Sequence, residues 1–120
     1  MLIENVRELL APLANGLPDL PEDATVDDLG PWRECIDALD RAIISLLNER
    51  VICANIIGRI KKRSSVPVYD PAREKIVIDN VKQHNKGPLS DEAVRRLFER
   101  IIDETRAVER QHYKNNDTES

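Results

Sequence analysis

The sequence predicts an all-α protein whose body is one helical domain of three helices: long, medium and long. Two observations predict this fold. Apolar residues recur at steps of three and four through most of the 120-residue chain, which is the spacing of one buried face of a helix. Charged residues make up 33% of the chain, whereas glycine occurs 4 times and aromatic residues make up only 3%. This composition favours helices over a β-sandwich.

Residues 1–30 are predicted to form an extension ahead of this body. Residues 2–14 carry apolar side chains at helical spacing and predict a short helix, with Asn15-Gly16 as a stop signal and Pro12 weakening the last turn. Residues 17–30 are rich in Pro and Asp and predict a linker with one helical turn. The simpler interpretation is an extension packed on the body, and a regulatory or partner-docking role stays open.

Residues 31–62 predict one unbroken helix, because Pro31 suits a first turn and no later proline interrupts the run. A helix of about 31 residues is about 46 Å long, whereas a compact chain of this size has a radius of gyration of about 14 Å. Such a helix protrudes from a monomer, so its apolar stripe requires a partner chain. The stripe consists of Trp32, Ile36, Leu39, Ile43, Leu46, Leu47, Ile57 and Ile60.

Three cations on this helix are candidate ligand-binding groups: Arg33, Arg50 and Lys61. Arg50 and Lys61 are eleven residues apart, which in a helix places them about 16 Å apart and within roughly 20° of each other around the axis. Two long side chains at this spacing converge on one small anion. Arg33 lies seventeen residues before Arg50, about 25 Å away and on a different azimuth. If Arg33 is functional, it therefore serves a site in another protomer.

Two further helices follow an extended loop of residues 63–69. Asp70-Pro71 supplies the N-cap and first residue of a medium helix, which ends before Gly87-Pro88. Ser90 is the predicted N-cap of the last helix. Residues 114–120 are polar and predict a frayed tail.

Polar groups interrupt the apolar faces of the first and third helices of the body. Thr105 and Glu109 continue the apolar face of the last helix at helical steps. Burying a carboxylate there without a partner would cost several kcal/mol. Arg50 and Lys61 pose the same problem with the opposite sign, and Arg73 stands beside the cap of the medium helix. Because cations outnumber anions among these five groups, the natural ligand is a small dianion.

Composition and charge argue against several classes of protein. A net charge of −4 disfavours nucleic-acid binding, which usually requires a basic face. The sequence shows no signal peptide and no apolar run of membrane-spanning length, so we expect a cytoplasmic protein that binds no membrane. Cys35 and Cys53 lie about 27 Å apart on one predicted helix, too far for a disulfide. With His84 and His112 as its only histidines and no Cys/His cluster, the chain predicts no metal site.

Four segments resemble the all-helical (class II) chorismate mutases over about residues 31–111: WRECIDALDRAIISLLNER, IGRIKK, PVYDPAREK and LFERIIDETRAVERQ. The cations, the YDPAREK turn and the order of the helices agree together, which makes the resemblance specific. It implies a mutase domain over residues 31–113, between the extension and the polar tail. It also implies an enzyme of phenylalanine and tyrosine biosynthesis that converts chorismate to prephenate by a Claisen rearrangement. Such enzymes are intertwined homodimers with two active sites, and the reaction needs no cofactor.

The resemblance also implies residue roles. Arg33 resembles the arginine contributed to the neighbouring protomer's site, and Arg50 the in-chain arginine that holds a substrate carboxylate. Lys61 corresponds to the lysine that bonds a carboxylate and the ether oxygen, and Glu109 to the second group at that oxygen. The remaining matches are Asp70 and Glu74 around the substrate hydroxyl, Arg73 near a carboxylate, and Thr105 at a serine/threonine contact position.

Glu109 departs from the commonest bacterial pattern, in which glutamine often holds this position. A neutral amide donates a hydrogen bond at any pH, whereas a carboxyl group donates only when protonated. The hypothesis is that Glu109 acts as a neutral acid in the complex, so that turnover favours mildly acidic conditions. Burial raises its pKa and Lys61 lowers it, and the sequence does not weigh the two. In the alternative interpretation Glu109 pairs with a cation and activity is flat with pH.

Two alternative functions stay open on the sequence. An isochorismate-pyruvate lyase on the same fold would use nearly the same cations and would release salicylate rather than prephenate. A helical dimerisation or regulatory module would keep the fold without the chemistry. Such a module could lose any one of the matched charged residues, and their joint presence favours the enzyme.

Overall fold

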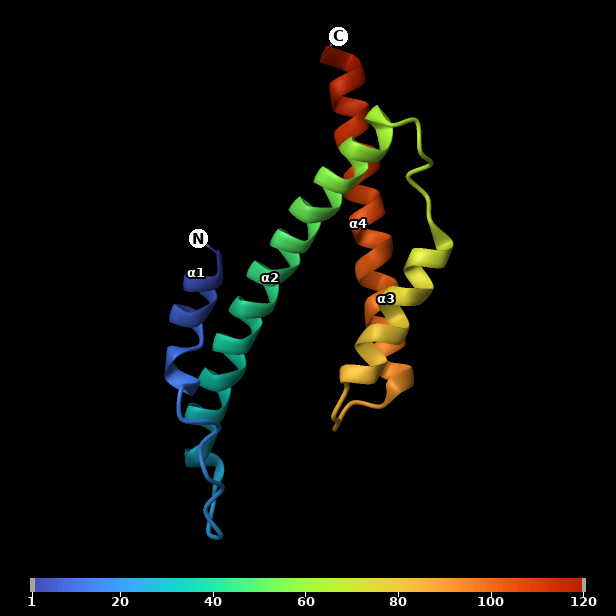
Figure 1. Cartoon of the computed structure of the whole chain (residues 1–120). Helices are drawn as coiled ribbons and strands as arrows, with labels where there is room; N and C mark the ends of the chain where they lie inside the picture. The colour runs from blue at the N-terminus through green and yellow to red at the C-terminus, as the bar shows by residue number, and fades with distance from the viewer. Residues whose placement is uncertain (1, 120) are drawn as a thin grey trace. The chain divides into compact units, whose positions relative to one another are not determined.

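The computed structural model describes residues 2–119, with side chains for residues 5–111. Every regular element in that part of the chain is helical (Figure 1), which confirms the predicted all-α class. The elements are α1 (Leu2–Leu9), the 3₁₀ turns η1 (Ala11–Leu13) and η2 (Val26–Asp28), and the helices α2 (Leu29–Arg63), α3 (Pro71–His84) and α4 (Asp91–Glu119). The chain divides into two compact units, Met1–Arg50 and Val51–Ser120, and the division falls within α2.

The helix of the N-terminal extension is shorter than residues 2–14 predict. It ends at Leu9, and the chain continues as η1, which carries Pro12 near its start. Proline lacks the N–H that an α-helix would use at this position, and its ring crowds the preceding turn. The turn predicted within residues 17–30 is present as η2.

A capping box leads the chain into α2. The side chain of Thr25 accepts a hydrogen bond from the backbone N–H of Asp27 at 3.3 Å, and the carboxylate of Asp28 accepts one from the backbone N–H of Thr25 at 2.8 Å. This reciprocal pair satisfies N–H groups that the start of a helix leaves unbonded. The long helix then runs for 35 residues. It starts two residues earlier and ends one residue later than predicted, with Pro31 in its first turn.

Most of the apolar stripe predicted for α2 is exposed in the single chain. Ile36, Ile43 and Ile57 expose 56%, 52% and 53% of their surface. The buried apolar side chains of this helix are the small ones of Ala38 and Ala42. The described part of the chain therefore leaves the stripe uncovered.

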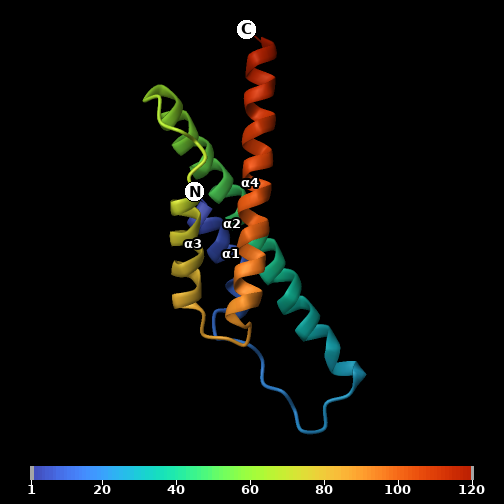
Figure 2. The same cartoon turned by 90° about the vertical axis from the view of Figure 1, so that its right-hand side faces the viewer.

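In the second unit, α3 and α4 lie side by side and antiparallel (Figures 1 and 2). Both helices start at the predicted caps. Asp70 accepts a hydrogen bond from the backbone N–H three residues on at 3.1 Å, and Ser90 does the same at 3.1 Å. Val94 and Ile102 of α4 are buried, and they form the core of this helical pair.

The last helix continues to Glu119, beyond the start of the polar tail predicted at residue 114. Residues 114–119 contain neither glycine nor proline, so no residue in this segment breaks the helical hydrogen bonding. Polarity alone did not end the helix.

Charged residues are interleaved with the apolar ones along all four α-helices. Within residues 2–119, no helix combines the length and the apolar character that crossing a membrane requires.

Candidate active site

Lys61 is held by the residue that starts the next helix. It lies in the last turn of α2, and its Nζ forms an ion pair with Oδ2 of Asp70 at 3.5 Å. The other carboxylate oxygen of Asp70 caps α3. The side chain of Lys61 is 23% exposed, and reduced contact with water strengthens the attraction of its ammonium group for an anion. One carboxylate thus orients Lys61 and fixes the first turn of α3.

Glu109 lies on α4 within the electrostatic reach of two cations. Burial raises the pKa of its carboxyl group above the ordinary value of 4.5, while Lys61 on α2 and Arg106 on α4 act in the opposite direction. Burial is the largest of these influences, so the net pKa is raised. The neutral form of Glu109 therefore persists to higher pH than that of an ordinary glutamate.

Thr105 lies one turn before Glu109 and is buried, with 6% of its surface exposed. Its Oγ1 donates a hydrogen bond to the backbone carbonyl of Ile101 at 2.8 Å. The hydroxyl donor is thus satisfied by the residue's own helix, and the oxygen keeps lone pairs that accept hydrogen bonds. Thr105 thus places a small polar group on the face of α4 that also carries the buried Ile102 and the acid Glu109.

Arg106 is a candidate that the sequence pattern does not single out. Its Nη2 forms ion pairs with Oε1 of Glu74 at 2.9 Å and with Oδ1 of Asp103 at 3.3 Å. Its guanidinium carbon lies 5.5 Å from the centroid of the Tyr69 ring, within the range of a cation–π interaction. The sequence feature that could have indicated Arg106 is its position between the two candidate site residues Thr105 and Glu109.

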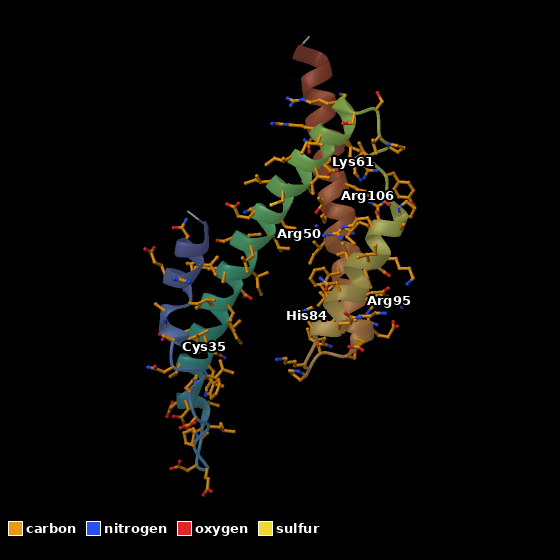
Figure 3. The ribbon with its side chains drawn as sticks, viewed as in Figure 1. Cys35, Arg50, Lys61, His84, Arg95 and Arg106 are labelled. Carbon is orange, nitrogen blue, oxygen red and sulfur yellow. The ribbon has the colours of Figure 1, made fainter. Side chains whose placement is uncertain are left out.

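The second unit brings together most of the residues predicted for the site and adds Arg106. Figure 3 labels Lys61 near the end of α2 and Arg106 on α4. The gathered residues are Lys61, Asp70, Glu74, Arg106 and Glu109. Thr105 lies one turn before Glu109 on the same helix. The gathered residues combine two cations, an acid whose pKa is raised by burial, and carboxylates already paired with cations. This combination suits an anionic ligand with an oxygen that accepts a hydrogen bond.

The other three predicted arginines lie elsewhere along the chain. Arg73 lies in the first turn of α3 with an exposed side chain, and its backbone N–H bonds to the Asp70 cap. Arg33 is exposed and Arg50 is half-buried, and both belong to the first unit. The roles of these arginines stay predictions.

A shallow groove of about 550 Å³ on α3 and α4 is a weaker candidate. Glu74 lines it, but Lys61, Thr105 and Glu109 do not. Its charged lining mixes four carboxylates with three cations, which does not favour a dianion. The charged lining residues are Glu74, Lys75, Asp79, Lys82, Arg95, Glu99 and Asp103. We therefore place the candidate site at Lys61 and Glu109 rather than in this groove.

Comparison with known proteins identifies the family of the chain. A family profile described as chorismate mutase type II matches residues 32–110. The chain is 46% identical over 87 residues to a bifunctional chorismate mutase/prephenate dehydratase of Neisseria gonorrhoeae, a match that covers 72% of this chain and 24% of the relative. It is 30% identical over 88 residues to a chorismate mutase of Methanocaldococcus jannaschii, covering 72% of this chain and 89% of the relative.

A solved structure of chorismate mutase (form II) from Thermus thermophilus has the same fold. It matches with a TM-score of 0.66 and 33% sequence identity, over 68% of this chain and 93% of that one. The chain spans about a quarter of the length of the bifunctional relatives that it matches.

Proposed function

Because the chain belongs to the type II chorismate mutase family, we propose that it converts chorismate to prephenate in phenylalanine and tyrosine biosynthesis, in the cytoplasm. The observation that carries this proposal is the cluster in which Lys61, paired with Asp70, lies beside the half-buried acid Glu109. A cation and a neutral acid are the two groups suited to an ether oxygen that gains negative charge as its C–O bond breaks. The extent of the match to the Methanocaldococcus jannaschii chorismate mutase, 89% of that chain, supports a mutase domain of this size.

Lys61 and Glu109 are proposed to act on the ether oxygen. Lys61 donates to this oxygen and to a substrate carboxylate, and the protonated carboxyl of Glu109 supplies the second hydrogen bond. Both groups are positioned before the substrate arrives, so little reorganisation is needed as charge develops. We expect Lys61 to make the largest single contribution to the rate.

The remaining residues are proposed to hold the substrate. Arg50 and Arg73 bind carboxylates, and Thr105 makes a further polar contact. The carboxylates of Asp70 and Glu74 accept hydrogen bonds from the ring hydroxyl of the substrate. These contacts favour the conformer in which the bond-forming carbons are close, which lowers the entropic part of the barrier. The rearrangement itself is intramolecular and requires no nucleophile from the protein.

The protein is proposed to act as an intertwined homodimer in which Arg33 reaches the partner's site. The exposed apolar stripe of α2 supports this assembly, because isoleucines at Ile36, Ile43 and Ile57 gain free energy when a second chain covers them. The sequence separation of Arg33 from Arg50 also supports a role in trans, since about 25 Å of helix lies between them.

The decisive experiment follows the loss of chorismate by absorbance, with product identification. Wild type is expected to form prephenate, and Lys61→Ala to lose on the order of a hundred- to a thousandfold in kcat. Lys75→Ala is the matched control, because Lys75 is exposed and pairs with Asp79 on its own helix at 2.8 Å. Absence of turnover by wild type, or release of salicylate from isochorismate instead, would reject the proposal.

A further inference from the structure

We propose that Arg106 is a positioning residue that holds the Glu74 carboxylate in place for the substrate hydroxyl. This inference rests on the proposed function, which places Glu74 beside that hydroxyl. It adds a residue that does not touch the substrate and acts through another side chain.

Three contacts hold the guanidinium group of Arg106. Its Nη2 bonds Glu74 on α3 at 2.9 Å and Asp103 on its own helix at 3.3 Å. The centroid of the Tyr69 ring, in the loop before α3, lies 5.5 Å from its guanidinium carbon. The side chains of Arg106 and Glu74 are 37% and 28% exposed, so the pair is shielded from water more than a surface ion pair. A guanidinium held in this way restricts the carboxylate that it binds.

The charge of Glu74 makes this partner necessary. An ionised carboxylate beside a dianionic substrate would repel it, and an unpaired carboxylate would also sample several rotamers. Arg106 neutralises the charge and leaves the second oxygen of Glu74 to accept from a hydroxyl. Loss of Arg106 should therefore weaken substrate binding in the ground state and the transition state equally, which raises KM with little change in kcat.

A double-mutant cycle tests whether Arg106 acts through Glu74. We expect Arg106→Met to raise KM for chorismate about five- to tenfold, the scale of one hydrogen-bonded ion pair. In a Glu74→Gln background the same substitution should change KM less than about twofold, because the carboxylate that Arg106 orients is gone. Arg100→Met is the matched control, since Arg100 lies on α4 and pairs with Glu104 on the same helix at 2.7 Å. This control should leave KM unchanged.

Three outcomes would overturn the inference. An equal rise in KM in the wild-type and Glu74→Gln backgrounds would mean that Arg106 binds the substrate itself. Its buried Nε–H could make that contact, because it has no hydrogen-bond partner among the described residues. An unchanged KM with a lower Tm would mean that Arg106 only links α3 to α4. If the methionine variant does not fold, Arg106→Gln carries the same comparison, and an unchanged KM there also rejects the inference.

The proposed function and this inference fail in different ways. An inactive wild type would reject the proposed function and, with it, the role of Arg106. An active wild type whose KM does not depend on Arg106 would reject the inference alone.

Discussion

The chemistry of Glu109 depends on its surroundings. Burial raises the pKa of its carboxyl group, and the opposing charges of Lys61 and Arg106 do not cancel that rise. Under the proposed mechanism the neutral form is the hydrogen-bond donor, so its population would set the fraction of competent enzyme. The structure thus gives direction to the hypothesis that the sequence could not decide.

We predict that turnover declines as pH rises through the raised pKa of Glu109 and is highest under mildly acidic conditions. Glu109→Gln should lose this decline, because an amide donates at every pH. A pH–rate profile of both proteins measures the difference. Profiles of the same shape would show that Glu109 does not act as an acid.

The same shift has a consequence for stability. The pKa of Glu109 is higher in the folded protein than in the unfolded one. At a pH below the unfolded pKa, Glu109 is protonated in both states and does not reduce the free energy of unfolding. As pH rises through the folded pKa, ionisation of the buried carboxyl disfavours the folded state. We predict that Glu109→Gln raises the free energy of unfolding at neutral pH relative to wild type and has a smaller effect in acid. Urea unfolding at two pH values tests this, and a larger gain in acid would contradict it.

Sequence reasoning reached Glu109 and missed Arg106 for a physical reason. Glu109 and Thr105 interrupt an apolar face at helical spacing, and this pattern can be recognised in the sequence alone. Arg106 matters because Glu74, Tyr69 and Asp103 meet around it. Two of those three partners come from outside α4, and their approach is fixed only by tertiary packing.

At the scale of elements, the side-chain caps of α3 and α4 were predicted correctly, whereas the ends of α1 and α4 were not. Asp70 and Ser90 cap α3 and α4 as predicted, because the side-chain bond to the third residue is local chemistry. The end of α1 at Leu9 and the continuation of α4 to Glu119 were not predicted. The last residue of a helix is set by small differences in the stability of its final hydrogen bonds, and the sequence predicts such differences poorly.

Asp70 allows the structural and the electrostatic role of one side chain to be separated. Asn is an equally good N-cap but cannot form an ion pair with Lys61. Ala can neither cap α3 nor pair with Lys61. We expect Asp70→Ala to lower the free energy of unfolding by about 1 kcal/mol and Asp70→Asn to lower it less. Both should reduce turnover, because Lys61 loses its ion pair. Equal destabilisation by the two substitutions would show that the cap is not the source of the loss.

At the scale of the whole molecule, α2 has more apolar surface than a single chain covers. Ile36, Ile43 and Ile57 are each more than half exposed. The sequence predicted this apolar stripe because its residues recur at helical spacing. The proposed partner chain follows from helix length and apolar pattern, and the contacts that it would make cannot be predicted from one chain alone.

Mixed dimers test the proposed exchange of Arg33. Inactive Arg33→Ala and inactive Lys61→Ala proteins, unfolded together and refolded, should form heterodimers in which one of the two sites has both wild-type residues. A random mixture then recovers about one quarter of wild-type activity, from the symmetry of the dimer. Separately refolded samples are the control. No recovery in a mixture shown to contain heterodimers would place Arg33 in its own chain's site.

If a dianion binds at Glu109 as proposed, the raised pKa of this residue couples binding to proton uptake. A dianion that arrives beside this carboxyl group adds two negative charges to its surroundings and raises the pKa further. Protein molecules that were ionised before binding then take up a proton from the buffer as the complex forms. Under the proposed function, affinity for the dianion therefore depends on the concentration of free protons as well as on the contacts of the dianion itself.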